Sequence, residues 1–190
     1  MDTIKRSTVT YLITPEGKTI MAEQQRKVIG LKGYGGIIES NEEPHASAVR
    51  EIWEESGGEK KRRLNPNEEG GIIVDSADLI PVALIDFYNG TEKEIPFGSP
   101  SFRMLCYVCY FFKGKAISTH EMHNPAEYPL ENLPYEKMII GDNLFLGNIL
   151  TNDISNKDRK CYKGFIRRTS DWKEIIEHEI LPCKKEDLVL

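Results

Sequence analysis

The sequence has no long apolar run and no excess of basic residues. No stretch of about 18 apolar residues occurs in the 190-residue chain, so we expect no membrane-spanning helix. The first ten residues, MDTIKRSTVT, lack the apolar segment of a secretory signal, and a cytoplasmic location is the default expectation. The formal net charge of −5 argues against a general nucleic-acid binder, because such proteins carry a basic surface.

Cysteine is scarce, which excludes a disulfide-rich framework. Four cysteines occur, at Cys106, Cys109, Cys161 and Cys183. Cys106 and Cys109 lie in an apolar, strand-like run, where residues three apart point to opposite faces, so their thiols are not expected to converge. Cys161 and Cys183 lack the spacing of a zinc site. We expect reduced cysteines with a structural role.

The composition is that of a globular chain with 39% apolar and 29% charged residues. The length suggests a single domain over residues 1–190, with a short C-terminal tail. Residues 59–71, EKKRRLNPNEEGG, have no apolar periodicity and contain proline and glycine, so we predict a charged, mobile surface insertion there. Contact of its basic residues with RNA or a partner is an alternative to a solvated loop.

Runs of β-branched and aromatic residues predict several strands. These runs cover residues 7–14, 19–22, 72–74, 79–88, 101–112 and 161–168. The run at 101–112, SFRMLCYVCYFF, is the most apolar and is expected to cross the centre of a sheet. Residues 173–180, KEIIEHEI, are compatible with either a helix or a strand.

Carboxylates are concentrated in residues 36–58, GIIESNEEPHASAVREIWEESGG. Pro44 suits the first turn of a helix, where its missing N–H costs nothing. Gly57 and Gly58 suit the end of that helix, because glycine accepts the left-handed conformation found there. On a helical wheel, one side gathers Glu51, Glu54 and Glu55, and the opposite side gathers Ala46, Val49, Ile52 and Trp53. We therefore predict that the apolar side is buried and that the acidic side is a separate, charged face.

Three carboxylates on one helix face repel each other, at a cost of a few tenths of a kcal/mol per i,i+4 pair. A solvated acidic face is one interpretation. The other is a hard divalent cation, since Mg²⁺ is usually held by a few carboxylates together with substrate phosphates.

The spacing of these residues resembles the Nudix box. That pattern is a glycine, five residues, a glutamate, seven residues, and then Arg-Glu-apolar-any-Glu-Glu-any-Gly. It is filled here by Gly36, Glu42, Arg50, Glu51, Ile52, Glu54, Glu55 and Gly57. Gly58 departs from the pattern, because an aliphatic residue is usual at that position.

The resemblance to the Nudix family implies an α/β fold, in which a mixed β-sheet is sandwiched between α-helices and the box forms a loop–helix–loop. It also implies Mg²⁺ as the cofactor, with Mn²⁺ as a substitute. The implied metal ligands are the Gly35 carbonyl group, Glu51, Glu54, Glu55 and, beyond the box, Glu121. Glu51 and Glu54 are the implied catalytic carboxylates, and which glutamate is the base stays open. Arg50 is expected to orient a glutamate, and Glu42 to steady the loop.

The region after the box resembles the MutT-like branch that hydrolyses oxidised purine nucleoside triphosphates. Leu133, Pro134, Tyr135 and Met138 carry this likeness. The base-binding positions of the branch are occupied here by Lys32, Ile139, Gly141 and Asp142. Ile139 stands where a tryptophan is usual and Lys32 where an asparagine is usual, so a preference for 8-oxoguanine does not carry over.

Two expectations about the substrate site keep an alternative. Arg26 and Lys27 are candidates for phosphate binding, and exposed basic residues on a loop are the equal alternative. Asp142 is a candidate for reading the base, and the alternative is an N-cap for a helix over residues 143–150.

The resemblance implies hydrolysis of a nucleoside diphosphate linked to another moiety, most directly by a (deoxy)nucleoside triphosphate pyrophosphohydrolase. An ADP-ribose or nucleotide-sugar pyrophosphatase is the alternative enzyme. A non-catalytic, nucleotide-sensing Nudix module is an alternative of another class. The expected partner is a small-molecule nucleotide, with no stable nucleic-acid partner, no membrane, and a monomeric or homodimeric protein.

Overall fold

The fold was analysed in a computed structural model, which describes residues 4–25, 29–90, 98–150 and 159–190. The strands are β1 (Lys5–Ile13), β2 (Lys18–Gln24), β3 (Gly30–Lys32), β4 (Gly71–Val74), β5 (Ile80–Asn89), β6 (Phe102–Cys109), β7 (Phe112–Lys115), β8 (Met122–Pro129), β9 (Cys161–Arg168) and β10 (Ile175–Cys183). The helices are α1 (Pro44–Glu55) and α2 (Leu146–Leu150). Short 3₁₀ turns are η1 (Lys60–Arg62), η2 (Ser76–Asp78), η3 (Leu130–Asn132), η4 (Tyr135–Lys137), η5 (Asp142–Leu144) and η6 (Lys185–Asp187).

One large mixed sheet organises the described residues. Its strand order is β10-β9-β5-β6-β1-β2-β3, and β8 pairs with β2. The β1–β6 and β5–β9 pairs are parallel, and the other neighbours are antiparallel. A separate two-stranded sheet joins β4 to β7. The strand β6 lies near the centre, as its apolar sequence predicts.

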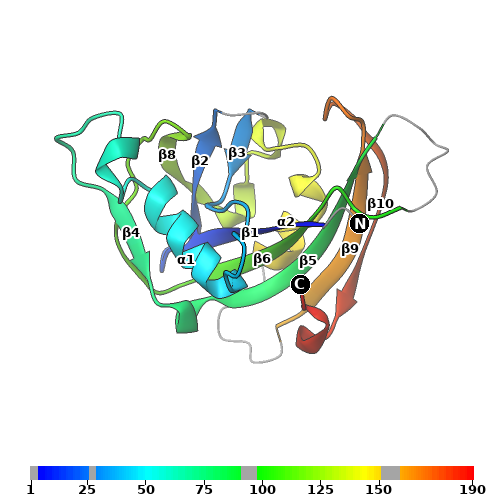
Figure 1. The fold of residues 1–190 in the computed structure, drawn as a ribbon. Coiled ribbons are helices and arrows are strands. Elements are labelled where there is room, and N and C mark those ends of the chain that lie inside the picture. Colours follow the sequence, from blue (N-terminus) through cyan, green and yellow to red (C-terminus); the bar gives the residue numbers. More distant parts are fainter. Residues whose placement is uncertain (1–3, 26–28, 91–97, 151–158) are drawn as a thin grey trace.

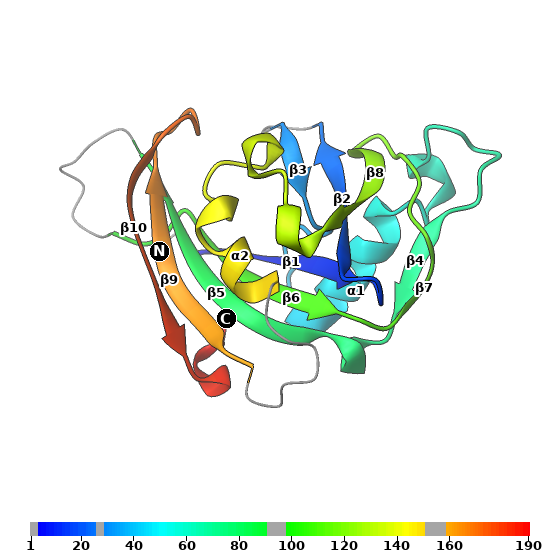
Figure 2. The same ribbon diagram turned by 180° about the vertical axis from the view of Figure 1, so that it is seen from behind.

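The two helices cover opposite faces of the large sheet (Figures 1 and 2). Alternate residues of β1 separate into two buried clusters: Tyr11 belongs to the cluster under α2, and Leu12 to the cluster under α1. This alternation follows from the two-residue period of a strand. The predicted α/β architecture, a mixed sheet between helices, is confirmed.

The cysteines follow the same alternation. Cys106 and Cys109 lie in different clusters, on opposite faces of β6, and all four cysteines are free thiols. Burial raises the pKa of the Cys106 thiol, so this group stays protonated. Cys106, Cys109 and Cys161 are buried and Cys183 is half-buried, and their structural role stays a prediction.

The helix α1 begins and ends as predicted, and Ile52 is buried on the predicted apolar side, but Ala46 and Trp53 are not. Pro44 occupies the first turn, and Gly57 follows the helix with φ = +102°. Ala46 is exposed and Trp53 is 37% exposed, whereas Glu55 is buried. The wheel assigned the buried side by hydrophobicity alone. In the fold, the acidic side is covered by the glycine-containing loop before the helix.

The C-terminal residues form structure that the sequence left open. Residues 175–183 are the edge strand β10, which pairs antiparallel with β9. After η6, Leu188 is buried in the cluster under α1. No helix within the described ranges has the length and apolarity needed to cross a membrane.

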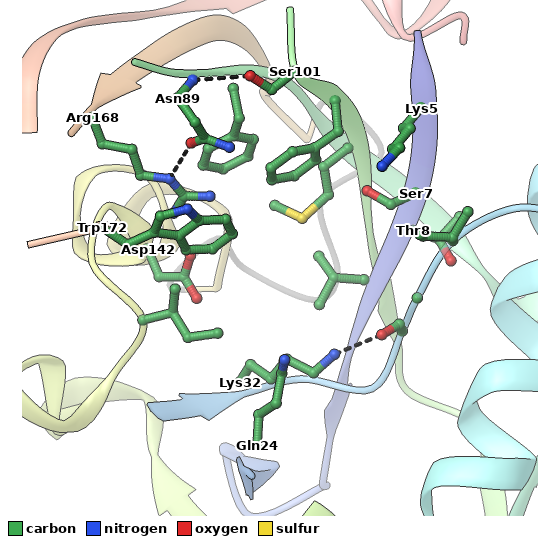
Figure 3. Close-up of a pocket in the computed structure, with 18 of the residues that line it drawn as sticks. Lys5, Ser7, Thr8, Gln24, Lys32, Asn89, Ser101, Asp142, Arg168 and Trp172 are labelled. Carbon is green, nitrogen blue, oxygen red and sulfur yellow. Dashed lines mark hydrogen bonds between the residues drawn. The ribbon is translucent and has the colours of Figure 1, made fainter. Parts of the chain in front are cut away.

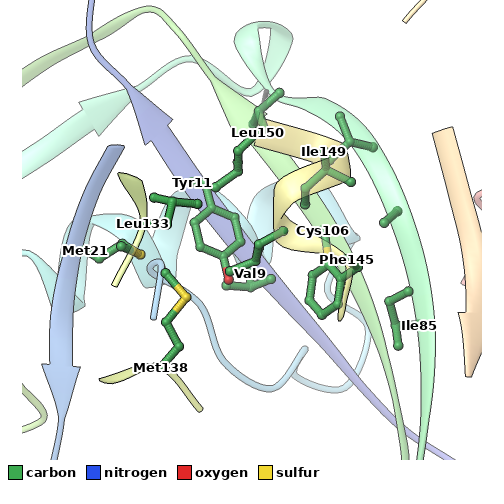
Figure 4. Packing of buried hydrophobic residues seen from close by; sticks show 14 of the residues in the cluster. Val9, Tyr11, Met21, Ile85, Cys106, Leu133, Met138, Phe145, Ile149 and Leu150 are labelled. Carbon is green, nitrogen blue, oxygen red and sulfur yellow. The ribbon is translucent and has the colours of Figure 1, made fainter. Parts of the chain in front are cut away.

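The packing under α2 predicts a stability difference between two phenylalanines. Phe145 is fully buried among the side chains of Figure 4, whereas Phe111 is 71% exposed. Phe145→Ala should lower the free energy of unfolding by about 3–5 kcal/mol, because it removes buried apolar surface and leaves a cavity. Phe111→Ala is the matched control and should change it by less than about 0.5 kcal/mol. Urea denaturation measures both, and equal losses would contradict the assignment of this core.

Candidate active site

The residues predicted as metal ligands line one cavity of about 430 Å³, here called the carboxylate cavity. They come from the loop after β3, from the last two turns of α1 and from the loop before β8. They are Gly35, Glu51, Glu54, Glu55 and Glu121. Residues far apart in the sequence therefore meet at one place, as the resemblance to the Nudix family implies.

Glu55 anchors the wall of this cavity. The backbone N–H of Gly35 donates to Glu55 Oε2 at 2.7 Å, and Lys32 Nζ lies 3.4 Å from Glu55 Oε1. Burial raises the pKa of Glu55 to about 7, while Lys32 and the Gly35 N–H oppose the shift. Lys32 Nζ also donates to the Gly35 carbonyl oxygen at 2.6 Å. The Lys32 ammonium group thus contacts two of the predicted metal-binding groups, the Glu55 carboxylate and the Gly35 carbonyl group.

Arg50 holds the rest of the box together. Its Nε and Nη2 donate to the two carboxylate oxygens of Glu42 at 2.9 and 3.0 Å, which is a bidentate pair. Its Nη1 donates to Glu51 Oε1 at 2.7 Å and to Glu54 Oε2 at 3.4 Å. The hydrogen bonds from Arg50 are the main reason that the pKa of Glu42 falls to about 2. Glu42 also accepts a hydrogen bond from the backbone N–H of Glu39, within the loop.

Residues 59–71 contribute two arginines that the sequence analysis did not assign to the site. Arg62 Nη1 lies 2.7 Å from Glu54 Oε2 and lines the carboxylate cavity. Arg63 Nε donates to the Gly57 carbonyl oxygen at 2.6 Å, which fixes the start of the segment to the end of α1. Residues 64–69 are exposed, whereas Arg62 and Arg63 contact the end of α1. The available signal was charge complementarity, since a basic run directly follows an acidic helix.

The donor set fits a hard divalent cation in its chemistry, because it consists of carboxylate and carbonyl oxygens. Among the described residues, no group of three or more His, Cys, Asp or Glu side chains is placed to hold a metal ion. Lys32, Arg50 and Arg62 lie among the carboxylates instead. Metal binding at these oxygens therefore requires the cationic side chains to give way.

A second cavity of about 360 Å³ adjoins the first and is here called the aromatic cavity (Figure 3). Both cavities are lined by Gln24, Lys32, Gly35, Gly36 and Ile37. The predicted substrate-binding residues Lys32, Ile139 and Asp142 line the aromatic cavity. Arg26 and Lys27 lie outside the described residues.

Asp142 is buried in the wall of the aromatic cavity, where it is 6% exposed. The N-cap of η5 is Gly141, without a side-chain cap, and the α-helix begins only at Leu146. The alternative in which Asp142 caps a helix over residues 143–150 is therefore wrong. Burial raises the pKa of Asp142 to about 7, and Arg168 and Lys32 oppose the shift.

Arg168 and Trp172 are lining residues that the sequence analysis missed. Arg168 is the last residue of β9, and its Nε donates to Asn89 Oδ1 at 2.8 Å. Trp172 belongs to the turn between β9 and β10. The box motif carries no information about this turn, so only the fold brings these side chains to the site.

The structure was compared with known proteins. No protein-family model matches the chain, and no curated protein matches it in sequence. Among solved structures, the mutator protein MutT from Bacillus halodurans superposes with a TM-score of 0.71 at 16% identity, over 93% of this chain and 97% of that chain. The chain has the Nudix fold.

A second solved structure that the chain resembles is that of a UDP-X diphosphatase. It superposes with a TM-score of 0.51 at 16% identity, over 79% of this chain and 64% of that chain. At such identities the likeness establishes the fold alone, and function has to be argued from the site.

The raised pKa of Asp142 predicts how stability depends on pH. Between its ordinary value of 3.8 and about 7, folded Asp142 keeps a proton that the unfolded chain releases. The free energy of unfolding contributed by this group therefore falls as the pH rises through that range. Asp142→Asn cannot release a proton, so its stability should decline less than that of the wild type between pH 4.5 and 7.5. Urea denaturation across this range measures the difference, and parallel curves for the two proteins would refute it.

Proposed function

We propose that the chain is a Mg²⁺-dependent Nudix hydrolase of nucleoside diphosphates linked to another moiety, and more narrowly a (deoxy)nucleoside triphosphate pyrophosphohydrolase. It acts in the cytoplasm as a monomer or homodimer. The observation that supports this proposal is the convergence of all five predicted metal ligands on one cavity, beside a second cavity with apolar and aromatic walls. One cavity suits a charged phosphate chain and the other suits a planar base.

In this proposal, the Gly35 carbonyl group, Glu51, Glu54, Glu55 and Glu121 hold the cation, and Mn²⁺ can replace Mg²⁺. These residues would hold the cation, whose charge would offset that of the phosphate oxygens when water attacks phosphorus. Glu51 or Glu54 accepts a proton from the attacking water. Arg50 fixes the orientation of both carboxylates through its hydrogen bonds.

The cationic side chains give the phosphate chain a second set of contacts. Lys32 lines both cavities, and Arg62 lines the carboxylate cavity. With a cation held by the glutamates, these side chains would be free to pair with phosphate oxygens at the same place. Arginine and lysine are the usual protein partners of phosphate groups.

There are two alternatives to this proposal. One is an enzyme with a different substrate, and the other is a module that binds nucleotides without catalysis. A nucleotide-sugar or ADP-ribose pyrophosphatase is supported by the structural likeness to the UDP-X diphosphatase. A nucleotide-sensing module without catalysis would need no complete set of acidic groups. All four box glutamates are present here, which favours an enzyme.

Glu54→Gln tests the role of the carboxylate cavity. The substitution keeps the size of the side chain and removes its charge, so turnover should fall roughly 100-fold or more. Mn²⁺ affinity, measured by electron paramagnetic resonance without nucleotide, should fall as well. Glu43→Gln is the matched control, because Glu43 is exposed just before α1 and outside the cavity, and it should retain wild-type values. Unchanged turnover in Glu54→Gln would refute the assignment of this residue.

The reaction itself is tested by a panel of nucleotides with Mg²⁺, with orthophosphate and pyrophosphate measured separately. Release of pyrophosphate and a nucleoside monophosphate from triphosphates is expected. Faster hydrolysis of ADP-ribose or a nucleotide sugar would replace the leading proposal with the alternative enzyme. Tight nucleotide binding without turnover would indicate a sensor.

A further inference from the structure

The aromatic cavity contains a buried arginine held in an unusual way. Arg168 is 1% exposed, and its Cζ lies 3.4 Å from the centroid of the Trp172 ring and 4.6 Å from that of Phe87. Trp172 has φ = +62°, in the left-handed region that costs energy for a bulky residue. The backbone of the turn between β9 and β10 is therefore strained at Trp172, and in this conformation the tryptophan ring stacks on the guanidinium group of Arg168.

The hydrogen bonds of Arg168 leave part of the guanidinium group available. Its Nε donates to Asn89 Oδ1 at 2.8 Å, and its Nη1 donates to the Ile140 carbonyl oxygen at 3.2 Å. These bonds use two of the five N–H donors of an arginine. The other three belong to Nη1 and Nη2, which form the outer fork that binds two acceptor atoms side by side. Because Arg168 lines the cavity, that fork is available to a ligand there.

Asp142 supplies a buried carboxyl group in the wall of the same cavity (Figure 3). No ion pair within 4.0 Å joins it to Arg168 in the described part of the chain. Buried polar and charged groups are costly unless other groups satisfy them. A ligand that places an acceptor atom against Arg168 and an N–H group against Asp142 would satisfy both.

A lactam, in which a carbonyl oxygen stands next to a ring N–H, has this pattern. Guanine, hypoxanthine, uracil and thymine carry it, whereas adenine and cytosine carry an amino group in place of the carbonyl oxygen. Arginine is also the side chain that most often reads the O6 and N7 acceptors of guanine. Phe102, Met104 and Ile139 line the same cavity and offer apolar surface to the faces of a ring.

We propose that Arg168 is a specificity-determining residue that selects keto bases over amino bases in the aromatic cavity. This inference rests on the proposed function, because it assigns the base of the nucleotide that is hydrolysed. It adds a residue outside the box to the substrate site.

Two nucleotide pairs isolate the keto group. Inosine and adenosine nucleotides differ at position 6 of the purine and in the adjoining N1–H, and uridine and cytidine nucleotides differ at the corresponding positions of the pyrimidine. The ratio of kcat/KM for ITP over ATP, or for UTP over CTP, should be at least about tenfold, given what one bidentate contact contributes. The pair that shows the preference identifies the purine or pyrimidine class.

Binding of the monophosphates gives a readout that does not depend on hydrolysis. The chain has two tryptophans, so Trp53→Phe leaves Trp172, in the cavity wall, as the only fluorophore of this kind. Without metal, IMP should change its fluorescence at lower concentrations than AMP, or UMP at lower concentrations than CMP.

Arg168→Met should reduce the preferred ratio to near one, because it removes the donor fork. Arg103→Met is the matched control. Arg103 is part-buried on β6 and pairs bidentately with Asp86 at 2.6 and 2.8 Å, and it does not line the cavity. This control should lower stability while it keeps the wild-type ratio. If Arg168→Met does not fold, the wild-type ratios and the monophosphate titrations decide the question.

The outcomes separate the two proposals. Keto-selective binding of monophosphates without hydrolysis of any triphosphate would support the role of Arg168 and overturn the proposed function. Hydrolysis at equal rates within both nucleotide pairs, or a preference that survives Arg168→Met, would overturn the role of Arg168 and leave the proposed function standing.

Discussion

The site depends on the close approach of the glycine-rich loop over residues 33–36 to the strand β1 and the helix α1. A Cβ atom at Gly33 would lie 2.4 Å from the Thr10 carbonyl oxygen, and one at Gly35 would lie 2.1 Å from that of Thr8. At Gly36, a Cβ atom would lie 2.6 Å from Glu51 Oε1. At Gly33 and Gly35 the close atoms belong to the backbone of β1, so only glycine permits these two contacts. They bring the Gly35 N–H group within hydrogen-bonding distance of Glu55 and cover the acidic side of the helix.

This packing carries an electrostatic cost that the neighbouring cations offset. Glu51, Glu54 and Glu55 lie close together, and burial is the largest factor that raises the pKa values of Glu54 and Glu55. Three cationic side chains then lie within 3.5 Å of one or more of these carboxylates, and they are Lys32, Arg50 and Arg62. Pairs that are partly shielded from water interact more strongly than surface pairs, so these contacts stabilise the arrangement. The same negative charge makes the cavity a suitable place for a divalent cation.

The sequence predicted the parts of the fold that depend on local chemistry. The proline and glycines that limit α1, the alternation of β6 and the position of the glycine loop all follow from properties of single residues. The wheel failed for Trp53 because hydrophobicity alone does not decide which side of a helix a distant loop will cover. Contacts that join distant elements were equally beyond prediction. The ion pair between Arg62 and Glu54 and the hydrogen bond from Arg168 to Asn89 depend on how the chain folds back on itself. Neither arginine belongs to a motif.

The two cavities divide the chemistry between different parts of the fold. The carboxylate cavity is formed largely by the box and by Arg62, whereas the far wall of the aromatic cavity comes from β5, β6, β9 and the turn after β9. Substitutions on β9 can therefore change which ligand is held without disturbing the helix that carries the glutamates. The residues that line both cavities are the exception, and they are Gln24, Lys32, Gly35, Gly36 and Ile37. A change at Lys32 would therefore alter the contacts of Glu55 and the lining of the neighbouring cavity together.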